Sequence, residues 1–207
     1  MSVATKRRSL YRDLVLAAAE HEFARVGFAD ARMAAIAKAA DLSLATVYKT
    51  FPGKGEIWNE LHAERMDALL ALVGERTSGA ASPLDRLVGG IAAVAEFLMA
   101  HGAYLELSLG ASSGWLTAAG DPGVQRTVWN SGLDMVAAGV EAAGAADELA
   151  DLRPRIAAGM VVSALQVWLA DWVESDRDRD PEVVVADLVS HLRAMLTTPA
   201  SYACTGT

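Results

Sequence analysis

Apolar residues recur along most of the chain at the three- and four-residue spacing that places them on one face of a helix. The first apolar stripe consists of Val15, Ala18, Ala19, Phe23 and Val26. Its helix is expected to start near Ser9 and to end at Gly27, because glycine tolerates the positive φ of a helix C-terminus. No segment alternates convincingly between apolar and polar residues, so the pattern predicts an all-α fold.

Polar, glycine and proline residues divide the chain into roughly nine predicted helices. Asp30 and Ser43 are expected to cap the second and third helices, which are both short. Pro83 and Pro181 stand where the first turn of a longer helix is expected. The longer helices are predicted over residues 54–73, 83–102, 123–143, 154–174 and 181–196.

The composition is that of a folded protein. The 207 residues are 53% hydrophobic and 21% charged, which supplies a sizeable core and differs from a disordered chain. Cys204 is the single cysteine, so a disulfide or cysteine-based metal site within one chain is excluded. The N-terminal residues lack the pattern of a signal peptide, and the apolar stretches are too short or too interrupted to span a bilayer. A cytoplasmic protein is expected.

Charge is distributed unevenly along the chain. Residues 1–55 contain nine Lys or Arg and five Asp or Glu, a net charge of +4, while the whole chain carries −8. A basic segment ahead of an acidic body fits a negatively charged partner. Such an uneven distribution of charge also arises by chance, so a sequence motif is needed to decide whether residues 1–55 bind a negatively charged partner.

The segment Ile36–Phe51 has the pattern of a helix-turn-helix. Ala37 and Ala40 are small enough to let a second helix cross closely. Asp41 stands in the turn, where a left-handed backbone is expected, and Val47 is expected to anchor the second helix in a small core. The second helix of such a motif enters the major groove of DNA and reads base edges.

The polar side chains around this helix suit that use. Thr46 and Thr50 can donate or accept hydrogen bonds, and Lys49 can reach a guanine edge or a phosphate. Lys54 stands at the start of the next helix, where a cation and free backbone N–H groups can hold a phosphate. Ordinary surface helices are the alternative interpretation of the same residues.

Residues 15–58 resemble the N-terminal DNA-binding domain of the TetR family of transcriptional regulators. The matching segments are AAAEHEFARVGF (17–28), IAKAADLS (36–43) and TVYKTFPGKGEIW (46–58). The last of them resembles the family's Thr-hydrophobic-Tyr-x-x-Phe-x-x-Lys signature, formed here by Thr46, Val47, Tyr48, Phe51 and Lys54. The resemblance implies a helix-turn-helix DNA-binding domain over 1–55, a helical ligand-binding and dimerisation domain over 56–200, and a frayed tail at 201–207.

The same resemblance implies which residues contact DNA. They are Arg32, Ser43, Leu44, Ala45, Thr46, Tyr48, Lys49, Thr50 and Lys54. Some positions depart from the family pattern. Asp41 replaces the usual glycine of the turn, Leu44 replaces a commonly polar residue, and Glu22 falls at a usually apolar position.

The remainder of the chain is rich in Trp and Met, which suit a mostly apolar ligand pocket. Plain core packing explains each of these residues when it is taken singly. The candidate ligand-binding residues are Met99, His101, Tyr104, Trp115, Trp129, Leu133, Met160, Gln166 and Trp168. The last two predicted helices are apolar over wide faces. The resemblance implies that they pair with their copies in a dimer, and coverage within one chain is the alternative.

The sequence therefore predicts a homodimeric, ligand-responsive regulator of transcription. It is expected to be a repressor that binds a palindromic DNA operator and is released by a small, largely apolar effector. No catalytic residue, metal site, cofactor or membrane partner is expected, because the four histidines are scattered and no phosphate loop or nucleophile elbow is present. The alternatives are a ligand-binding protein without DNA-binding activity, an activator of the same fold, and an all-α enzyme.

Overall fold

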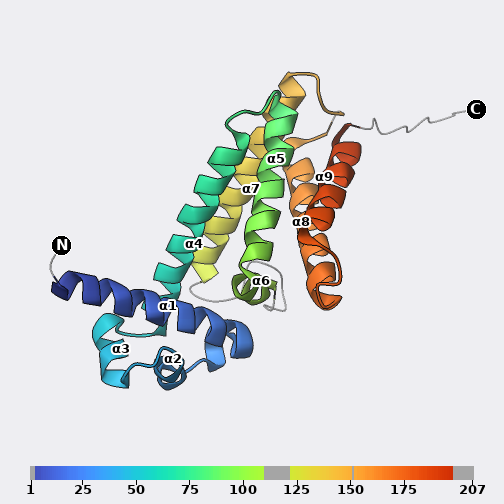
Figure 1. Ribbon diagram of the computed structural model, residues 1–207. Helices are drawn as coiled ribbons and strands as arrows, with labels where there is room; N and C mark the ends of the chain where they lie inside the picture. The colour runs from blue at the N-terminus through green and yellow to red at the C-terminus, as the bar shows by residue number, and fades with distance from the viewer. Residues whose placement is uncertain (1–2, 110–121, 151, 198–207) are drawn as a thin grey trace, which may run out of the picture. The chain divides into compact units, whose positions relative to one another are not determined.

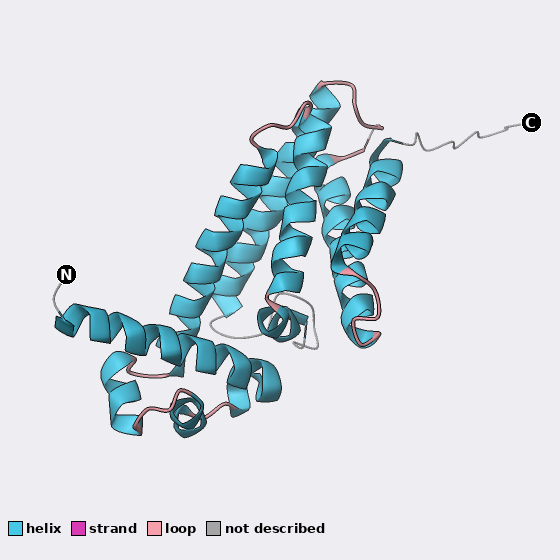
Figure 2. Cartoon of the chain, in the orientation of Figure 1, coloured by secondary structure: helices cyan, strands magenta, loops and turns pink. Residues whose placement is uncertain are grey.

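The computed structural model describes residues 3–109, 122–150 and 152–197 (Figure 1). These residues form nine helices and no strand (Figure 2), so the predicted all-α fold is confirmed. The helices are α1 (Val3–Asp30), α2 (Met33–Ala39), α3 (Leu44–Thr50), α4 (Lys54–Thr77), α5 (Pro83–Ala100), α6 (Gly102–Leu109), α7 (Pro122–Ala145), α8 (Pro154–Glu174) and α9 (Pro181–Thr197).

The chain divides into two compact units. The first unit combines Met1–Ala68 with His101–Thr127, and so contains α1 to α3, the start of α4, all of α6 and the first residues of α7. The second unit combines Leu69–Ala100 with Val128–Thr207. The division lies within α4, after Ala68, whereas the expected boundary followed residue 55.

An apolar core holds the first unit together. Val15 and Phe23 of α1, Ile36 of α2 and Val47 of α3 are fully buried. The ring of Trp58 on α4 lies edge-on to Phe23, with 6.2 Å between the ring centroids, a favourable aromatic arrangement. Burial of each large side chain contributes about 1.5–3 kcal/mol. The core therefore fixes the short helices α2 and α3, which are too short to be stable alone.

The second unit has its own core, in which α5, α8 and α9 pack on one another. Fully or nearly fully buried side chains include Val88 on α5, Leu169 on α8 and Leu192 on α9. Helix α7 approaches α5 closely at Gly139, where an added Cβ would lie 3.0 Å from Leu87 Cδ1. The tight approach explains a glycine inside a helix.

Several predicted helix ends are confirmed. Helix α8 has the predicted bounds, and Pro154 occupies its first turn. Ser43 caps α3 as expected. Two predictions are wrong. Helix α1 begins at Val3 rather than near Ser9, and α2 has Arg32 as its N-cap residue, with no side-chain cap hydrogen bond, instead of a cap from Asp30.

Gly27 interrupts α1 at the expected position. Its backbone has φ 80° and ψ 159°, a region that is essentially restricted to glycine. Helical structure resumes after it for one short turn that ends at Asp30. Gly27 thus turns the chain toward α2, and the bend depends on its lack of a side chain.

Replacement of Gly27 by alanine is expected to destabilise the fold by about 1–3 kcal/mol through backbone strain. No atom lies within 4 Å of the position of the added Cβ, so steric overlap does not contribute. The measurement is a thermal melt followed by circular dichroism.

Gly55→Ala is the matched control, because Gly55 lies in helix α4 and also has free space around its Cβ position. That change should stabilise the fold by about 0.5–1 kcal/mol. Equal melting temperatures for the two variants would contradict the assignment of strain to Gly27.

Candidate nucleic-acid interface

The turn between α2 and α3 is built without glycine. Asp41 has a left-handed backbone with φ 55°, a conformation that Asp tolerates better than most residues. Its N–H donates to the Lys38 carbonyl (3.2 Å), and the Leu42 N–H donates to the Ala37 carbonyl (3.0 Å). The last carbonyls of α2 are therefore satisfied within the turn, and the chain is redirected into α3.

Hydroxyl groups stabilise α3 from within. The Ser43 hydroxyl oxygen accepts from the Thr46 N–H (3.1 Å) and lies 2.8 Å from the Thr46 hydroxyl. The Thr50 hydroxyl donates to the Thr46 carbonyl (2.9 Å). Three of the polar side chains expected to contact DNA thus already have partners inside the helix.

Four other residues form the exposed face of α3. Leu44 and Tyr48 are 42% and 50% exposed, and Ala45 and Lys49 are exposed beside them. Each pair is separated by four residues and therefore lies in one row on the helix surface. The face presents two apolar side chains, one phenol and one cation, while Val47 is fully buried on the opposite side.

The cations of residues 1–55 fall into two groups. Arg12 forms ion pairs with Glu60 and Glu64, both at 2.6 Å, and Arg25 pairs with Glu22 at 2.9 Å. The pairing with Arg25 explains how Glu22 is accommodated at a position that is usually apolar in the family pattern. The exposed cations with no ion pair among the described residues are Lys6, Arg7, Arg8, Arg32, Lys38 and Lys49.

Lys54 has partners within the chain. Its ammonium group donates to the carbonyls of Phe28 (2.8 Å), Ala29 (2.6 Å) and Ala31 (3.3 Å). From the sequence, this ammonium group is expected to contact a DNA phosphate. In the structure its three donors are directed at the junction between α1 and α2.

Arg12 and Glu20 hold α1 against α4 through ion pairs that escaped the sequence prediction. Arg12 contacts two carboxylates of α4, and their hydrogen bonds raise the pKa of its guanidinium. Glu20 is buried and pairs with Arg65. One signal was available for the second pair, since Glu20 interrupts the apolar stripe of α1 between Leu16 and Phe23. Its partner on α4 has no comparable signal.

Tyr104, a candidate ligand-binding residue, lies inside the first unit. Its hydroxyl is 2.7 Å from Nδ1 of His62, and the His62 ring stacks on Trp58 with 5.8 Å between centroids. Burial lowers the pKa of His62 and raises that of Tyr104, so both groups are neutral near pH 7. The contact links α6 to α4, and the candidate His101 lies half-buried at the start of α6.

The other described candidates lie in the second unit in different settings. Met99 is buried and lines a groove between α5 and α9. Met160 is exposed on α8, while Leu133 and Gln166 are half-buried. Trp168 lines another groove. Trp115 and the side chain of Trp129 lie outside the described residues.

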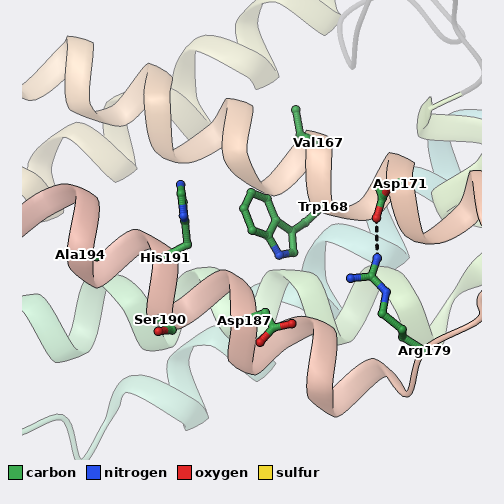
Figure 3. Close-up of a pocket in the computed structure, with 8 residues that line it drawn as sticks. All are labelled: Val167, Trp168, Asp171, Arg179, Asp187, Ser190, His191 and Ala194. Carbon is green, nitrogen blue, oxygen red and sulfur yellow. Dashed lines mark hydrogen bonds and ion pairs between the residues drawn. The ribbon is translucent and has the colours of Figure 1, made fainter.

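The groove at Trp168 follows α8 and α9 and has a volume of about 590 Å³ (Figure 3). The rings of Trp168 and His191 are 4.9 Å apart between centroids. Arg179 forms an ion pair with Asp171 along the same groove. Among the described residues, no group of His, Cys, Asp and Glu is placed to hold a metal ion.

Comparison with known sequences matches residues 15–61 to the family described as bacterial regulatory proteins, tetR family. No curated protein matches the chain. The matched segment contains α2, α3 and the start of α4, and so includes the whole helix-turn-helix.

Solved structures extend the similarity to the rest of the fold. The fatty acid degradation regulator FadR from Bacillus halodurans is 19% identical, with a TM-score of 0.74 over 89% of this chain and 98% of that one. The ketosteroid transcriptional regulator KstR2 of Mycobacterium tuberculosis is 19% identical, with a TM-score of 0.72 over 90% of this chain and 95% of that one. AibR in complex with isovaleryl coenzyme A and operator DNA is 19% identical, with a TM-score of 0.72 over 90% of this chain and 97% of that one.

The family match covers the helix-turn-helix, and the shared fold covers the two-unit architecture around it. The chain therefore matches the tetR family of bacterial regulatory proteins over residues 15–61 and shares its fold with these solved regulators over 89–90% of its length.

Proposed function

We propose that the chain regulates transcription as a homodimeric repressor that reads a palindromic DNA operator with α3. The exposed face of α3 carries the proposal, because Leu44, Ala45, Tyr48 and Lys49 are displayed together on a helix anchored by Val47. The similarity in fold to AibR, which was solved with operator DNA, supports the same use. A DNA-binding regulator is expected to be cytoplasmic.

The four side chains divide the reading of DNA by chemistry. Lys49 suits a guanine edge or a phosphate, and the methyl groups of Leu44 and Ala45 suit the thymine methyl group. Arg32, exposed at the N-terminus of α2, suits a phosphate. Ser43, Thr46 and Thr50 keep free acceptor capacity, since each hydroxyl oxygen has two lone pairs.

Selection from a random library of double-stranded DNA tests the proposal. The wild-type protein should enrich a palindrome whose half-sites are about one helical turn, 34–36 Å, apart or a multiple of it. A reporter gene placed behind that site should be expressed more strongly when the protein is absent if it is a repressor. Failure to enrich any sequence would refute DNA reading, and the opposite response of the reporter would identify an activator.

Lys49→Ala and Tyr48→Phe should each weaken binding to the selected duplex. The expected cost is about 1–3 kcal/mol for a lost base contact, and for Lys49 a salt dependence that is shallower by about one unit of slope if it contacts a phosphate. Both residues are exposed, so the fold should be retained. Fluorescence anisotropy at several salt concentrations provides the measurement.

Arg86→Ala is the matched control, because it removes an exposed cation from α5 in the second unit. Its affinity for the duplex should equal that of the wild type. An unchanged affinity in the Lys49 and Tyr48 variants would exclude α3 as the reading helix.

The homodimer is proposed to form through α8 and α9. Ile156, Met160 and Val167 are 56%, 41% and 61% exposed on α8, and Val183 on α9 is 51% exposed. By length and composition α8 could also cross a membrane. Its exposed side includes the charged Asp171, however, and a surface of this mixed kind fits a second copy better than lipid.

Val167→Glu should convert the dimer to a monomer, because it places a charge within the proposed contact. Sedimentation velocity at micromolar concentration measures the change. Leu70→Glu is the control, since Leu70 is similarly exposed, at 51%, on α4 in the second unit. A wild-type protein that sediments as a monomer would contradict the homodimer. A dimer that persists in Val167→Glu would mean that the contact lies elsewhere.

The effector is proposed to be a small, largely apolar molecule. The names of the three structural relatives refer to isovaleryl coenzyme A, fatty acid degradation and ketosteroids, which supports this class. The candidate residues assigned from the sequence remain the proposed contacts, with Met99 and Trp168 as the members that line grooves in the second unit.

A ligand of this class should stabilise the protein and release it from DNA. At a concentration of 100 times Kd, binding to the native state alone adds about 2.7 kcal/mol to the free energy of unfolding. Isovaleryl coenzyme A, palmitoyl coenzyme A and a steroid are suitable probes, with free coenzyme A as the control. If no probe raises the melting temperature or weakens DNA binding, the effector belongs to another class.

A further inference from the structure

Three backbone carbonyls, two in the last turn of α1 and one directly after it, surround the ammonium group of Lys54. The distances from Nζ are 2.8 Å to the Phe28 oxygen, 2.6 Å to that of Ala29 and 3.3 Å to that of Ala31. An ammonium group has three N–H donors, so each carbonyl can receive one. The same Nζ atom lies 4.9 Å from the centre of the Phe28 ring, within the range of a cation–π contact.

The three carbonyls belong to a bend where a cation is favoured. Gly27 interrupts α1 immediately before them with φ 80°, and carbonyl groups at a helix end carry partial negative charge and lack partners in the next turn. Phe28 also packs on Phe23 and Trp58, with centroid distances of 5.3 and 6.2 Å. The ammonium group therefore joins a bend in the backbone to the aromatic core of the first unit.

Lys54 also closes the helix-turn-helix on itself. Arg32, the N-cap residue of α2, directly follows Ala31. At the other end, Phe51 is the C-cap residue of α3, and its N–H donates to the Val47 carbonyl (2.8 Å). Only Pro52 and Gly53 separate Phe51 from Lys54. The residue that follows the motif thus bonds to the residues that precede it.

We propose that Lys54 is a positioning residue for DNA reading and that it acts through the bend rather than through a phosphate. Its three contacts hold α2 and α3 at the angle that presents Tyr48 and Lys49 to the groove. The inference rests on the proposed DNA-binding function. It departs from the phosphate contact that the sequence resemblance implies, because a phosphate would have to displace a carbonyl that Lys54 already bonds.

Two substitutions separate the alternatives. Lys54→Met keeps the length of the stem and removes the charge. Lys54→Arg keeps the charge, but the planar guanidinium group cannot place three N–H donors on carbonyls that converge on one point. An arginine still binds phosphate well. Loss of a phosphate contact therefore predicts that only the methionine variant is impaired, whereas loss of positioning predicts that both are.

The experiment measures affinity for the duplex selected by the wild-type protein and for poly(dI-dC), a non-specific DNA, over a range of salt concentrations. Both Lys54 variants should lose on the order of tenfold in affinity for the selected duplex. Their salt slope should match the wild type, and their non-specific affinity should stay unchanged. Simple unfolding would lower both affinities together. Lys49→Met is the control, and its salt slope should fall by about one unit if Lys49 contacts a phosphate.

Wild-type affinity in Lys54→Arg, together with a slope lowered by about one unit in Lys54→Met, would overturn the proposal. A second readout needs no DNA. Amide hydrogen exchange at residues 29–36 of the free protein should be faster in both Lys54 variants and unchanged in Lys49→Met. Unchanged exchange in the Lys54 variants would also overturn it. If the wild-type protein selects no duplex, the proposed function fails, while the exchange experiment still tests the clamp.

Discussion

The packing of α3 depends on a constraint of length. Seven residues make about two turns, and a helix that short is not stable in water. It therefore needs tertiary contacts and caps at both ends. Val47 supplies the buried anchor, and Ser43 caps the N-terminus. One inward-facing residue and a set of hydrogen bonds from hydroxyl groups hold the helix. The exposed side chains of α3 are therefore not needed to keep it folded.

The same need for tertiary contacts explains why some cations of residues 1–55 bond within the protein. Arg12 attaches α1 to α4 through two carboxylates, and Lys54 attaches the start of α4 to the bend after α1. These contacts hold the elements that carry α2 and α3. A net charge therefore overstates the positive charge available to a nucleic acid, and exposure and pairing of each cation decide how much remains.

Periodicity in the sequence predicted most of the fold. The apolar spacing located the helices, Pro83 and Pro181 marked two helix starts, and Val47 was identified as the anchor of α3, where it is the buried residue. Such features are local, since each depends on residues within a few positions. The true N-cap of α2 and the start of α1 were missed, because exposed turns at helix ends are held by weak preferences.

The contacts of Lys54 show what a local pattern cannot supply. The sequence places a lysine at a helix start, and that position suits a phosphate as well as it suits a carbonyl. The choice is made by Gly27, which lies far away in the chain and turns three carbonyls toward the ammonium group. Similarly, the residues proposed to bind a ligand share a chemical type, but Met99 and Trp168 line different grooves of the second unit. Type alone does not determine proximity.

The distribution of polar groups on α3 bears on which residues could give affinity for DNA and which could give specificity for its sequence. Hydrogen bonds within α3 already engage the hydroxyl groups of Ser43, Thr46 and Thr50, so their capacity to donate to bases is reduced. If α3 reads DNA as proposed, direct reading falls mainly on Tyr48, Lys49 and the methyl groups of Leu44 and Ala45, a set that favours thymine-containing steps over a dense pattern of hydrogen bonds. Exposed cations outside α3, such as Arg32 and Lys38, are suited to sequence-independent contact with the backbone. Sequence-specific binding by such a helix would depend on the angle at which α3 is held, since few strong base contacts could correct a misaligned helix.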